Sequence, residues 1–207
     1  MNKKKGIFIS FEGPEAVGKS TQLIALKKFL IKRNIPFIFT REPGGTLIFE
    51  KLRKIILNKR NPISTTEEIL LLMSGRLNHI NKIIKPSLEK GKIVITDRFA
   101  DSSFVYQGYV NKFGLEKTIS LHKQLLNNFL PDKTFLFITN PSIILTRLKK
   151  RTRLNKYDKH DINFHIKVIK GYKKLSKNNK RFILLNAESS FDIVQNKIQK
   201  AILKLIK

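Results

Sequence analysis

A glycine-containing loop near the start of the chain restricts the possible folds more than any other feature. Residues 13–20 read G-P-E-A-V-G-K-S and match the pattern G-x-x-x-x-G-K-[ST] at every fixed position. An apolar run, residues 7–11, precedes the loop, and a helical pattern begins near Gly18. In such a unit the backbone N–H groups of the loop and the positive end of the helix face one anion. This phosphate loop therefore predicts an α/β fold that binds a nucleotide.

The side chains of the phosphate loop indicate what kind of nucleotide it holds. Lys19 places a positive charge near the β- and γ-phosphates, and Ser20 offers its hydroxyl group to Mg²⁺. We therefore expect a nucleoside triphosphate, with magnesium as the cofactor. The residues expected to contact it in this loop are Gly13, Pro14, Glu15, Ala16, Val17, Gly18, Lys19, Ser20 and Thr21.

Length and composition exclude several classes of protein. The 207 residues suit a single domain, and no internal repeat or glycine-serine linker divides them. Because the chain has no cysteine, disulfide bonds, thiolate catalysis and cysteine-based zinc sites are excluded, in agreement with a reducing compartment. The apolar runs are short and interrupted by charges, so none is expected to span a membrane. We expect one cytoplasmic domain over residues 1–207.

The chain is strongly basic, with 42 Lys and Arg residues, 15 Asp and Glu residues and a net charge of +27. Such a charge is common in nucleic-acid-binding proteins, and a nucleic-acid-associated ATPase is one alternative. The lysines, however, are spread over nearly every helical pattern, and no basic and aromatic binding module stands out. The favoured interpretation is a basic surface with no nucleic acid partner, whose charge helps to attract polyanionic substrates.

Strand-like and helical patterns alternate along the chain. The strand-like runs are residues 6–11, 36–40, 92–96, 133–139 and 181–185. This alternation predicts a five-stranded parallel sheet with helices on both faces. One long helical pattern covers residues 66–90, with Ser64 or Thr65 as its cap and Pro86 as the site of a kink. An amphipathic helix is expected at 191–206.

Charged residues follow the strands of the predicted sheet. The second strand leads into R-E-P-G-G-T at 41–46, the third into Asp97 and Arg98, and the fourth into a helix and a basic run at 147–153. Ligands of open parallel sheets bind at the carboxyl ends of the strands. A simple nucleotide-hydrolysing motor does not need arginines after several strands. Two phosphorylated ligands, a donor triphosphate and an acceptor monophosphate, explain them.

With these residues in place, the chain resembles the thymidylate kinases, a family of P-loop nucleoside monophosphate kinases. The matching motifs are F-E-G-P-E-A-V-G-K-S-T (11–21), T-R-E-P-G-G-T (40–46), K-L-R (51–53), D-R-F-A-D-S-S-F-V-Y-Q-G (97–108), P-x-x-x-x-x-R (141–147) and F-H-x-x-V-x-x-G-Y (164–172). The resemblance implies the P-loop kinase fold and the reaction of ATP with dTMP to give ADP and dTDP. It also implies a mobile lid at about 147–160 and a homodimer formed through helices near 66–90 and 101–129.

For the donor side, the resemblance implies that Lys19 and the loop amides hold the ATP phosphates. Ser20, together with Asp97 acting through water, would hold Mg²⁺, although capping of a helix is the alternative role for Asp97. Arg147 is expected on the ATP side. Because no arginine stands among residues 14–17, the lid is expected to supply one from Arg151 or Arg153 to the transferred phosphoryl group.

For the acceptor phosphate, Arg53, Arg76 and Arg98 are expected to surround the anion, since planar guanidinium groups suit phosphate oxygens. Arg98 is counted with the catalytic residues Lys19, Glu15 and the lid arginine. Arg41 is expected to brace Glu42 and the loop geometry.

The rest of the acceptor nucleotide has its own expected contacts. The resemblance implies that Glu15 contacts the sugar 3′-hydroxyl or the water shell of the metal ion. Tyr106 would lie under the sugar, with a core aromatic role as the alternative, while Gln107 and Ser103 would bind polar edges of thymine. Pro43 would form one wall of the base site.

Several positions depart from the family pattern, and two of them are expected site residues. Leu72 stands four residues before Arg76, where an aromatic side chain is usual and would stack on thymine, and Ala16 stands where glycine is common. The loss of stacking favours the second alternative, a kinase for another deoxynucleoside monophosphate. That enzyme would keep all the phosphate chemistry.

Overall fold

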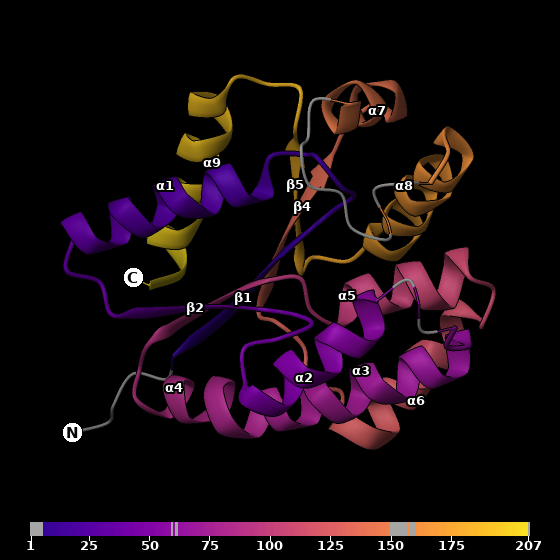
Figure 1. The fold of residues 1–207 in the computed structure, drawn as a ribbon. Coiled ribbons are helices and arrows are strands. Elements are labelled where there is room, and N and C mark those ends of the chain that lie inside the picture. Colours follow the sequence, from indigo (N-terminus) through magenta and orange to yellow (C-terminus); the bar gives the residue numbers. More distant parts are fainter. Residues whose placement is uncertain (1–5, 59, 61, 150–156, 158–159, 207) are drawn as a thin grey trace.

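The computed structural model describes residues 6–58, 60, 62–149, 157 and 160–206. Its centre is one sheet of five parallel strands in the order β2-β3-β1-β4-β5 (Figure 1). The strands are β1 (Ile7–Glu12), β2 (Phe37–Arg41), β3 (Ile93–Asp97), β4 (Lys133–Ile138) and β5 (Phe182–Asn186). Each lies within one residue of its predicted bounds, so the prediction of a five-stranded parallel sheet is confirmed.

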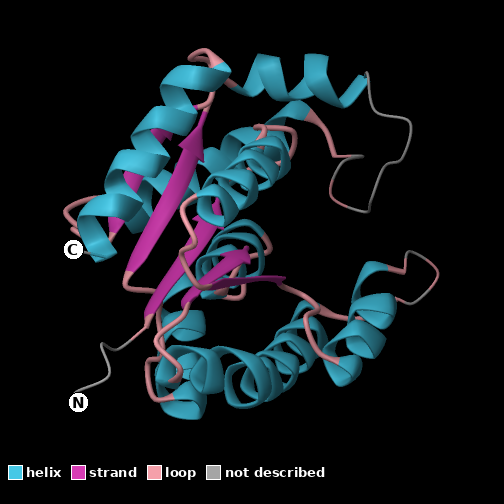
Figure 2. Ribbon diagram, turned by 90° about the vertical axis from the view of Figure 1, so that its left-hand side faces the viewer, coloured by secondary structure: helices cyan, strands magenta, loops and turns pink. Residues whose placement is uncertain are grey.

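Helices connect the strands and cover both faces of the sheet, as Figure 2 shows. The helices are α1 (Lys19–Lys32), α2 (Leu47–Leu57), α3 (Thr65–His79), α4 (Lys85–Glu89), α5 (Ala100–Ser103), α6 (Leu115–Leu126), α7 (Pro141–Lys149), α8 (Ile162–Ser176) and α9 (Phe191–Ile206), with π-helical segments at Ile80–Ile84 and Phe104–Val110. Within the described ranges, no helix is both long and apolar enough to cross a bilayer.

The two faces of the sheet bury separate apolar cores. Side chains alternate along a strand, so neighbours in β1 enter different cores. Ile9 packs in the core beneath α1 and α9, with Leu26 and Ile198. Phe8 packs with Ile69 in the opposite core, to which α3, α4, α5 and α6 contribute. Because β1 is central and covered on both faces, its residues are apolar almost throughout.

The predicted helix at 66–90 consists of α3, a π-helical segment and α4. Ser64 is its cap: the Ser64 hydroxyl oxygen accepts from the Glu67 N–H group, and the Glu67 carboxylate accepts from the Ser64 N–H group. The widened π-helical turn lies just before Pro86, which has no N–H group to continue the regular helical pattern. The irregularity expected at Pro86 therefore begins a turn earlier.

All five strands end at one edge of the sheet, and this edge carries the residues of interest. In the strand register Phe11 lies opposite Asp97, and Asp97 lies opposite Arg41. The phosphate loop, the turn at 42–46 and the turn at 98–99 follow directly. Segments far apart in the sequence are thereby brought together, as ligand binding by an open parallel sheet requires.

Candidate active site

The phosphate loop has a geometry that two glycines make possible. Gly13 has φ 138°, and a Cβ atom there would lie 2.6 Å from the backbone oxygen of Phe137. Gly18 has φ 88° and precedes α1, whose first turn has no side-chain cap among the described residues. The first N–H groups of α1 are therefore available to an anion.

Lys19 is buried and folds back over the phosphate loop. Its Nζ atom donates to the carbonyl oxygens of Gly13 at 3.1 Å and Pro14 at 2.9 Å. Burial, together with the charge of Arg98, lowers the pKa of Lys19 to about 8. A bound phosphate would favour the charged ammonium group, so a triphosphate ligand compensates for this burial.

The residues expected to hold magnesium suit a hydrated cation. Ser20 and Asp97 line the same pocket, which has an empty volume of about 990 Å³ and extends along the phosphate loop. The Oδ1 atom of Asp97 is buried and has no hydrogen-bond partner among the described residues. Oxygen ligands and retained waters are what Mg²⁺ prefers, and a metal-bound water would satisfy this orphaned carboxylate oxygen.

A second hollow lies on the other side of the phosphate loop, between α1 and the segment after β5. It has an empty volume of about 580 Å³. Arg147 crosses it and donates to the carbonyl oxygens of Ala16 at 3.4 Å and Ala187 at 3.1 Å. The guanidinium plane offers a surface on which a purine base can stack. Arg147 is thus placed beside the phosphate loop, and its predicted role on the ATP side stays a prediction.

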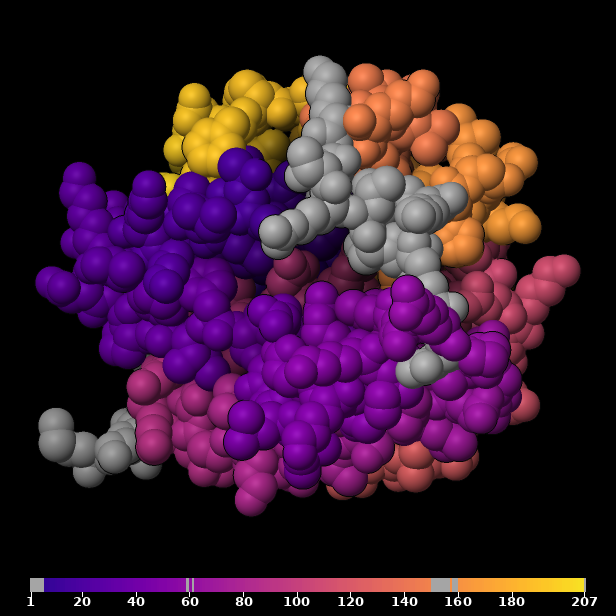
Figure 3. Space-filling view, in the orientation of Figure 1, coloured from indigo at the N-terminus to yellow at the C-terminus, as the bar shows by residue number. Residues whose placement is uncertain are grey.

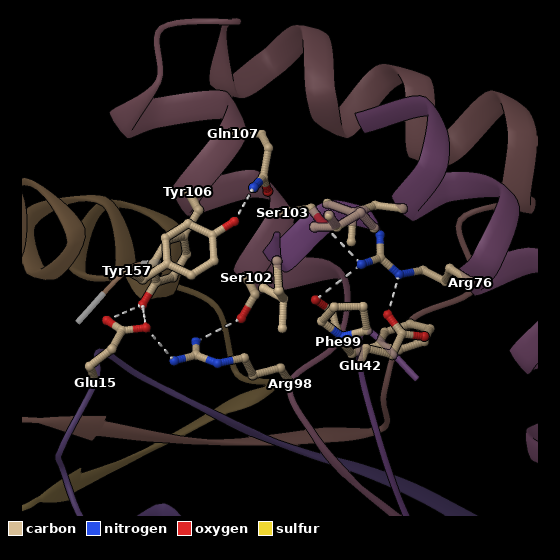
Figure 4. A pocket seen from close by; sticks show the side chains of 14 residues that line it. Glu15, Glu42, Arg76, Arg98, Phe99, Ser102, Ser103, Tyr106, Gln107 and Tyr157 are labelled. Carbon is tan, nitrogen blue, oxygen red and sulfur yellow. Dashed lines mark hydrogen bonds and ion pairs between the residues drawn. The ribbon is translucent and has the colours of Figure 1, made fainter. Parts of the chain in front are cut away.

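A third cavity adjoins the phosphate pocket on the side of β2 and α3 (Figure 4). Its empty volume is about 420 Å³, and its walls are largely apolar. Pro43, Leu72 and Phe99 contribute to these walls, together with Ile56 and Leu57 of α2. The polar side chains around it are Glu15, Glu42, Arg76, Arg98, Ser102, Ser103, Tyr106, Gln107 and Tyr157. The cavity is suited to a flat ring with a few polar edges.

Glu15, Arg98 and Tyr106 meet where the phosphate pocket and the apolar cavity join. The Tyr106 hydroxyl group donates to both Glu15 oxygens, at 2.8 and 2.7 Å, and Arg98 Nη2 lies 2.9 Å from Oε1. The Arg98 guanidinium carbon also lies 5.2 Å from the centre of the Tyr106 ring. Burial raises the pKa of Tyr106, so its hydroxyl group remains a donor. The carboxylate in the phosphate loop therefore has the positive and hydrogen-bonding partners that its burial requires.

Arg98 itself is held by its backbone and by the phosphate loop. Its φ of 69° is unusual for a residue with a side chain, and the Thr96 hydroxyl group donates to the Arg98 carbonyl oxygen at 2.7 Å. The Nη1 atom donates to Gly13 O at 3.0 Å and Ser102 Oγ at 3.1 Å. These contacts fix one guanidinium group against both pockets.

The three arginines expected around one phosphate do not lie together. Arg53 lines the phosphate pocket and donates to the Pro43 carbonyl oxygen at 2.6 Å, while Arg98 borders both spaces. Arg76 instead lies in the wall of the apolar cavity, bonded to Glu42 and Ser103 at 2.7 and 2.9 Å. The sequence-based grouping is wrong for Arg76, because α3 presents it beyond the end of β2.

The expectation that Arg41 braces Glu42 is also wrong. Arg41 is the last residue of β2 and Glu42 follows the strand, and their side chains have different partners. Arg41 pairs with Glu50 at 2.9 Å, and Glu50 also accepts from the Gly45 N–H group at 3.0 Å. Arg41 therefore supports the loop geometry through α2, and Glu42 faces α3.

Several residues of the site were missed at the level of the sequence. Glu68 of α3 is buried and accepts from the Gln107 amide nitrogen at 2.9 Å. Tyr157 also donates to Glu68 and borders the cavity. Glu42, within T-R-E-P, was expected only as a partner of Arg41. Its position directly after a strand was the signal that could have identified Glu42.

The lid residues Arg151 and Arg153 lie outside the described residues. The other predicted site residues, including Pro43, Ser103 and Gln107, line one of the pockets named above or belong to the phosphate loop.

A family model described as "Thymidylate kinase" matches residues 11–198. The chain belongs to the thymidylate kinase family. It is 40% identical over 205 residues to a thymidylate kinase of Mycoplasma capricolum, covering 97% of this chain and 96% of that one. A thymidylate kinase of Caldicellulosiruptor saccharolyticus is 37% identical over 98% of both chains, and one of Rickettsia africae is 42% identical over 84% of this chain and 85% of its own.

Two residues that depart from the pattern of the thymidylate kinase family, Leu72 and Ala16, lie within this site. Leu72 is buried against Phe49 and Ile56 and also lines the apolar cavity, so the position of the usual aromatic ring does face the expected base site. Ala16 has φ 55°, a left-handed conformation that glycine adopts more readily. Both departures therefore lie at positions that line the pockets.

Beneath the phosphate loop lies a carboxyl group that the sequence-based site did not include. Glu12 is fully buried and accepts hydrogen bonds from Phe99 N at 2.7 Å, Ser102 Oγ at 2.6 Å and Tyr172 OH at 2.9 Å. Burial, reinforced by the charge of Asp101, raises the pKa of Glu12 from 4.5 to about 7.

This raised pKa predicts a pH-dependent stability. The stabilising contribution of protonated Glu12 is fully present below pH 4.5 and is lost as the pH rises to about 7. Glu12→Gln imitates the protonated form at every pH. We compare the free energies of unfolding of Glu12→Gln and the unchanged protein, measured with urea. The difference between them should shift by about 2–3 kcal/mol in favour of Glu12→Gln from pH 5 to pH 8.

Glu116→Gln, at an exposed acid in the first turn of α6, serves as the control and should show no such gain. Equal pH dependence of the unchanged protein and Glu12→Gln would contradict the assignment.

Proposed function

We propose that this chain transfers the γ-phosphoryl group of ATP to dTMP, giving ADP and dTDP. The observation that carries the proposal is the junction at Glu15 and Arg98, where a phosphate pocket and an apolar base-sized cavity share their walls. A nucleotide in the cavity would direct its 5′-phosphate toward the phosphate loop. Donor and acceptor phosphates would then meet beside one guanidinium group.

The donor nucleotide would lie along the phosphate loop. The loop amides, the first turn of α1 and Lys19 would bind its β- and γ-phosphates, and Arg147 would lie against its base. Ser20 and Asp97 would hold Mg²⁺, which lowers the negative charge of the phosphates when it is bound. These residues orient the terminal phosphoryl group toward the acceptor.

The thymine base would fill the apolar cavity. Arg76 Nη1, whose contact among the described residues is the Met73 sulfur at 3.9 Å, can donate to a base carbonyl. The Gln107 amide nitrogen donates to Glu68, which leaves the amide oxygen as an acceptor for the N3–H group of thymine. Pro43, Leu72 and Phe99 would enclose the ring and its methyl group.

The deoxyribose and the transferred group would lie at the junction. The Tyr106 ring, beside Glu15, would support the sugar and disfavour a 2′-hydroxyl group, and Glu15 would accept from the 3′-hydroxyl group. Arg98 and Arg53 would bind the acceptor phosphate and help to offset the charge of the oxygens in the transition state. The chain supplies positioning and charge, which is most of what phosphoryl transfer requires.

The acceptor preference tests this function. A coupled assay with ATP and either dTMP, dUMP, UMP or CMP should give the highest kcat/KM with dTMP and a lower value with dUMP, which lacks the methyl group. The ribonucleotides UMP and CMP should be poor acceptors. Comparable values for all four would refute the specificity, a preference for another deoxynucleotide would favour the sister enzyme, and DNA-stimulated ATP hydrolysis without transfer would favour the nucleic-acid-associated ATPase.

We also propose that residues 1–207 form one kinase domain with a lid at about 147–160, and that a lid arginine completes the active site. Either Arg151→Ala or Arg153→Ala should lower kcat by about 10³-fold or more, because an arginine on the equatorial oxygens contributes about 10³ to 10⁵ in rate. Lys149→Ala, at an exposed residue ending α7, is the control. Near-normal turnover of both arginine variants would refute the lid mechanism. The cytoplasmic location stays a prediction.

An exposed apolar surface supports the proposal of a homodimer. In Figure 3 the segment from α2 to α3 forms the lower front of the molecule. It exposes Leu47 and Ile48 of α2 and Leu70 and Leu77 of α3, and α6 next to α3 adds Leu125. Leu70 and Leu77 are seven residues apart and share one helix face. A second copy would cover this surface, which otherwise leaves large apolar side chains in water.

Charge on this face should break the dimer. Leu70→Glu combined with Leu77→Glu should convert a dimer into a monomer in sedimentation analysis, because a dimer would bury the two carboxylates near their symmetry mates. Ile24→Glu on α1, also at an exposed apolar residue, should leave the dimer intact. A monomeric unchanged protein, or a dimeric double variant, would overturn this proposal.

A further inference from the structure

A buried chain of hydrogen bonds runs from β2 to the wall of the apolar cavity. The Glu42 carboxylate lies at its centre, where Oε2 accepts from Arg76 Nε at 2.7 Å and Oε1 contacts His79 Nδ1 at 2.9 Å. His79 Nε2 lies 2.7 Å from the Thr40 hydroxyl oxygen. Arg76 and His79 have exposed fractions of 1% and 0%, so water does not compete for these contacts. Each bond is therefore strong and costly to lose.

The hydrogen-bond chemistry gives each member one role. A carboxylate can only accept, so Nδ1 of His79 carries the hydrogen. In the neutral imidazole Nε2 then accepts from Thr40, which fixes the ring. With Oε1 of Glu42 occupied by His79, Oε2 is directed at Arg76. The torsion of this carboxylate is thus set by the histidine.

The loop after β2 closes over the chain of bonds. Gly45 has φ 87°, and a Cβ atom there would lie 2.5 Å from Thr40 Oγ1 and 2.7 Å from His79 Nε2. Backbone can therefore approach this pair where a side chain could not. The same loop carries Pro43, which lines both the phosphate pocket and the cavity. The buried polar contacts and the ligand-facing wall are parts of one rigid unit.

Arg76 is the end of this unit that reaches the cavity. Its Nη2 atom donates to Ser103 Oγ at 2.9 Å and the Phe99 carbonyl oxygen at 3.4 Å, and its guanidinium group lies over the Phe99 ring. With Nε held by Glu42 and Nη2 by Ser103, the remaining nitrogen, Nη1, keeps a defined direction (Figure 4). Nη1 contacts the Met73 sulfur at 3.9 Å and can donate its other hydrogen to a ligand.

We infer that Glu42 and His79 are positioning residues, which act through Arg76 to hold a donor toward the base of the acceptor nucleotide. This inference rests on the proposed function, since it needs a nucleotide base in the cavity. Without the His79 donor, one oxygen of Glu42 has no partner. That oxygen can then accept from Arg76 Nη2 in place of Ser103, and this change rotates the guanidinium group. Leu72 provides no aromatic stacking here, so the base depends more heavily on this donor.

Two polar replacements of His79 separate positioning from simple structural support. The amide nitrogen of an asparagine side chain lies two bonds beyond Cβ, as Nδ1 does, so His79→Asn keeps a donor for Glu42. The amide oxygen of glutamine lies three bonds beyond Cβ, as Nε2 does, so His79→Gln keeps an acceptor for the Thr40 hydroxyl group. In His79→Gln the KM for dTMP should rise about tenfold, with the KM for ATP within twofold. In His79→Asn the KM for dTMP should stay within about threefold.

A double-variant cycle then tests whether the effect passes through Arg76. Arg76→Lys keeps a positive partner for Glu42 and removes the forked donor, so it should itself raise the KM for dTMP. Adding His79→Gln to Arg76→Lys should change that KM by less than about twofold. Far-UV circular dichroism and urea unfolding confirm that each variant is folded at the assay temperature.

Three results would overturn the inference: equal rises in the KM for dTMP in His79→Asn and His79→Gln, an equal rise in the KM for ATP, or additive effects in the double variant. Failure of the unchanged protein to use dTMP would instead refute the proposed function. If an arginine or histidine variant does not fold, Glu42→Gln provides the second measurement, since it weakens the same link from the other side. It should raise the KM for dTMP and leave the KM for ATP within twofold, and equal changes in both would again overturn the inference.

Discussion

The half-buried Arg98 guanidinium group is the group on which the arrangement of this site depends. It bonds to the Gly13 carbonyl oxygen and the Glu15 carboxylate of the phosphate loop, while its backbone follows β3. A cation in this position needs fixed partners because partial burial removes much of its water. These partners draw the loop after β1 and the turn after β3 onto one point. The phosphate pocket and the base-sized cavity consequently share a charged boundary.

A second ion pair, which is fully buried, shapes the other end of the cavity. Glu42 bonds to Arg76 and His79 of α3, and the loop between β2 and α2 closes over them. Removing one member would leave the others charged or polar in a space without water, which is why such networks hold a single geometry when they are complete. The two ion pairs lie at opposite sides of the cavity. Between them, apolar walls leave room for a ring.

Much of the fold could be predicted because its signals are local. The loop at 13–20 carries its glycines at fixed spacing, and apolar runs with breaks between them marked all five strands to within one residue. The cap at Ser64 could be limited to two candidates because capping involves residues only three apart. The phosphate side of the site could be predicted for the same reason, since loop amides, Lys19 and Ser20 belong to one continuous segment.

The sequence by itself determined the sheet, the phosphate loop and the family resemblance, because these depend on periodicity and on short contiguous motifs. The tertiary structure alone decided which charges pair. Arg41 ends β2 and Glu42 follows it directly, yet the two side chains pair with different neighbours, Glu50 of α2 and Arg76 of α3. Arg76 lies apart from the expected phosphate cluster, because the packing of α3 determines where its guanidinium group lies. Pairing across the fold depends on distances that no spacing along the chain encodes.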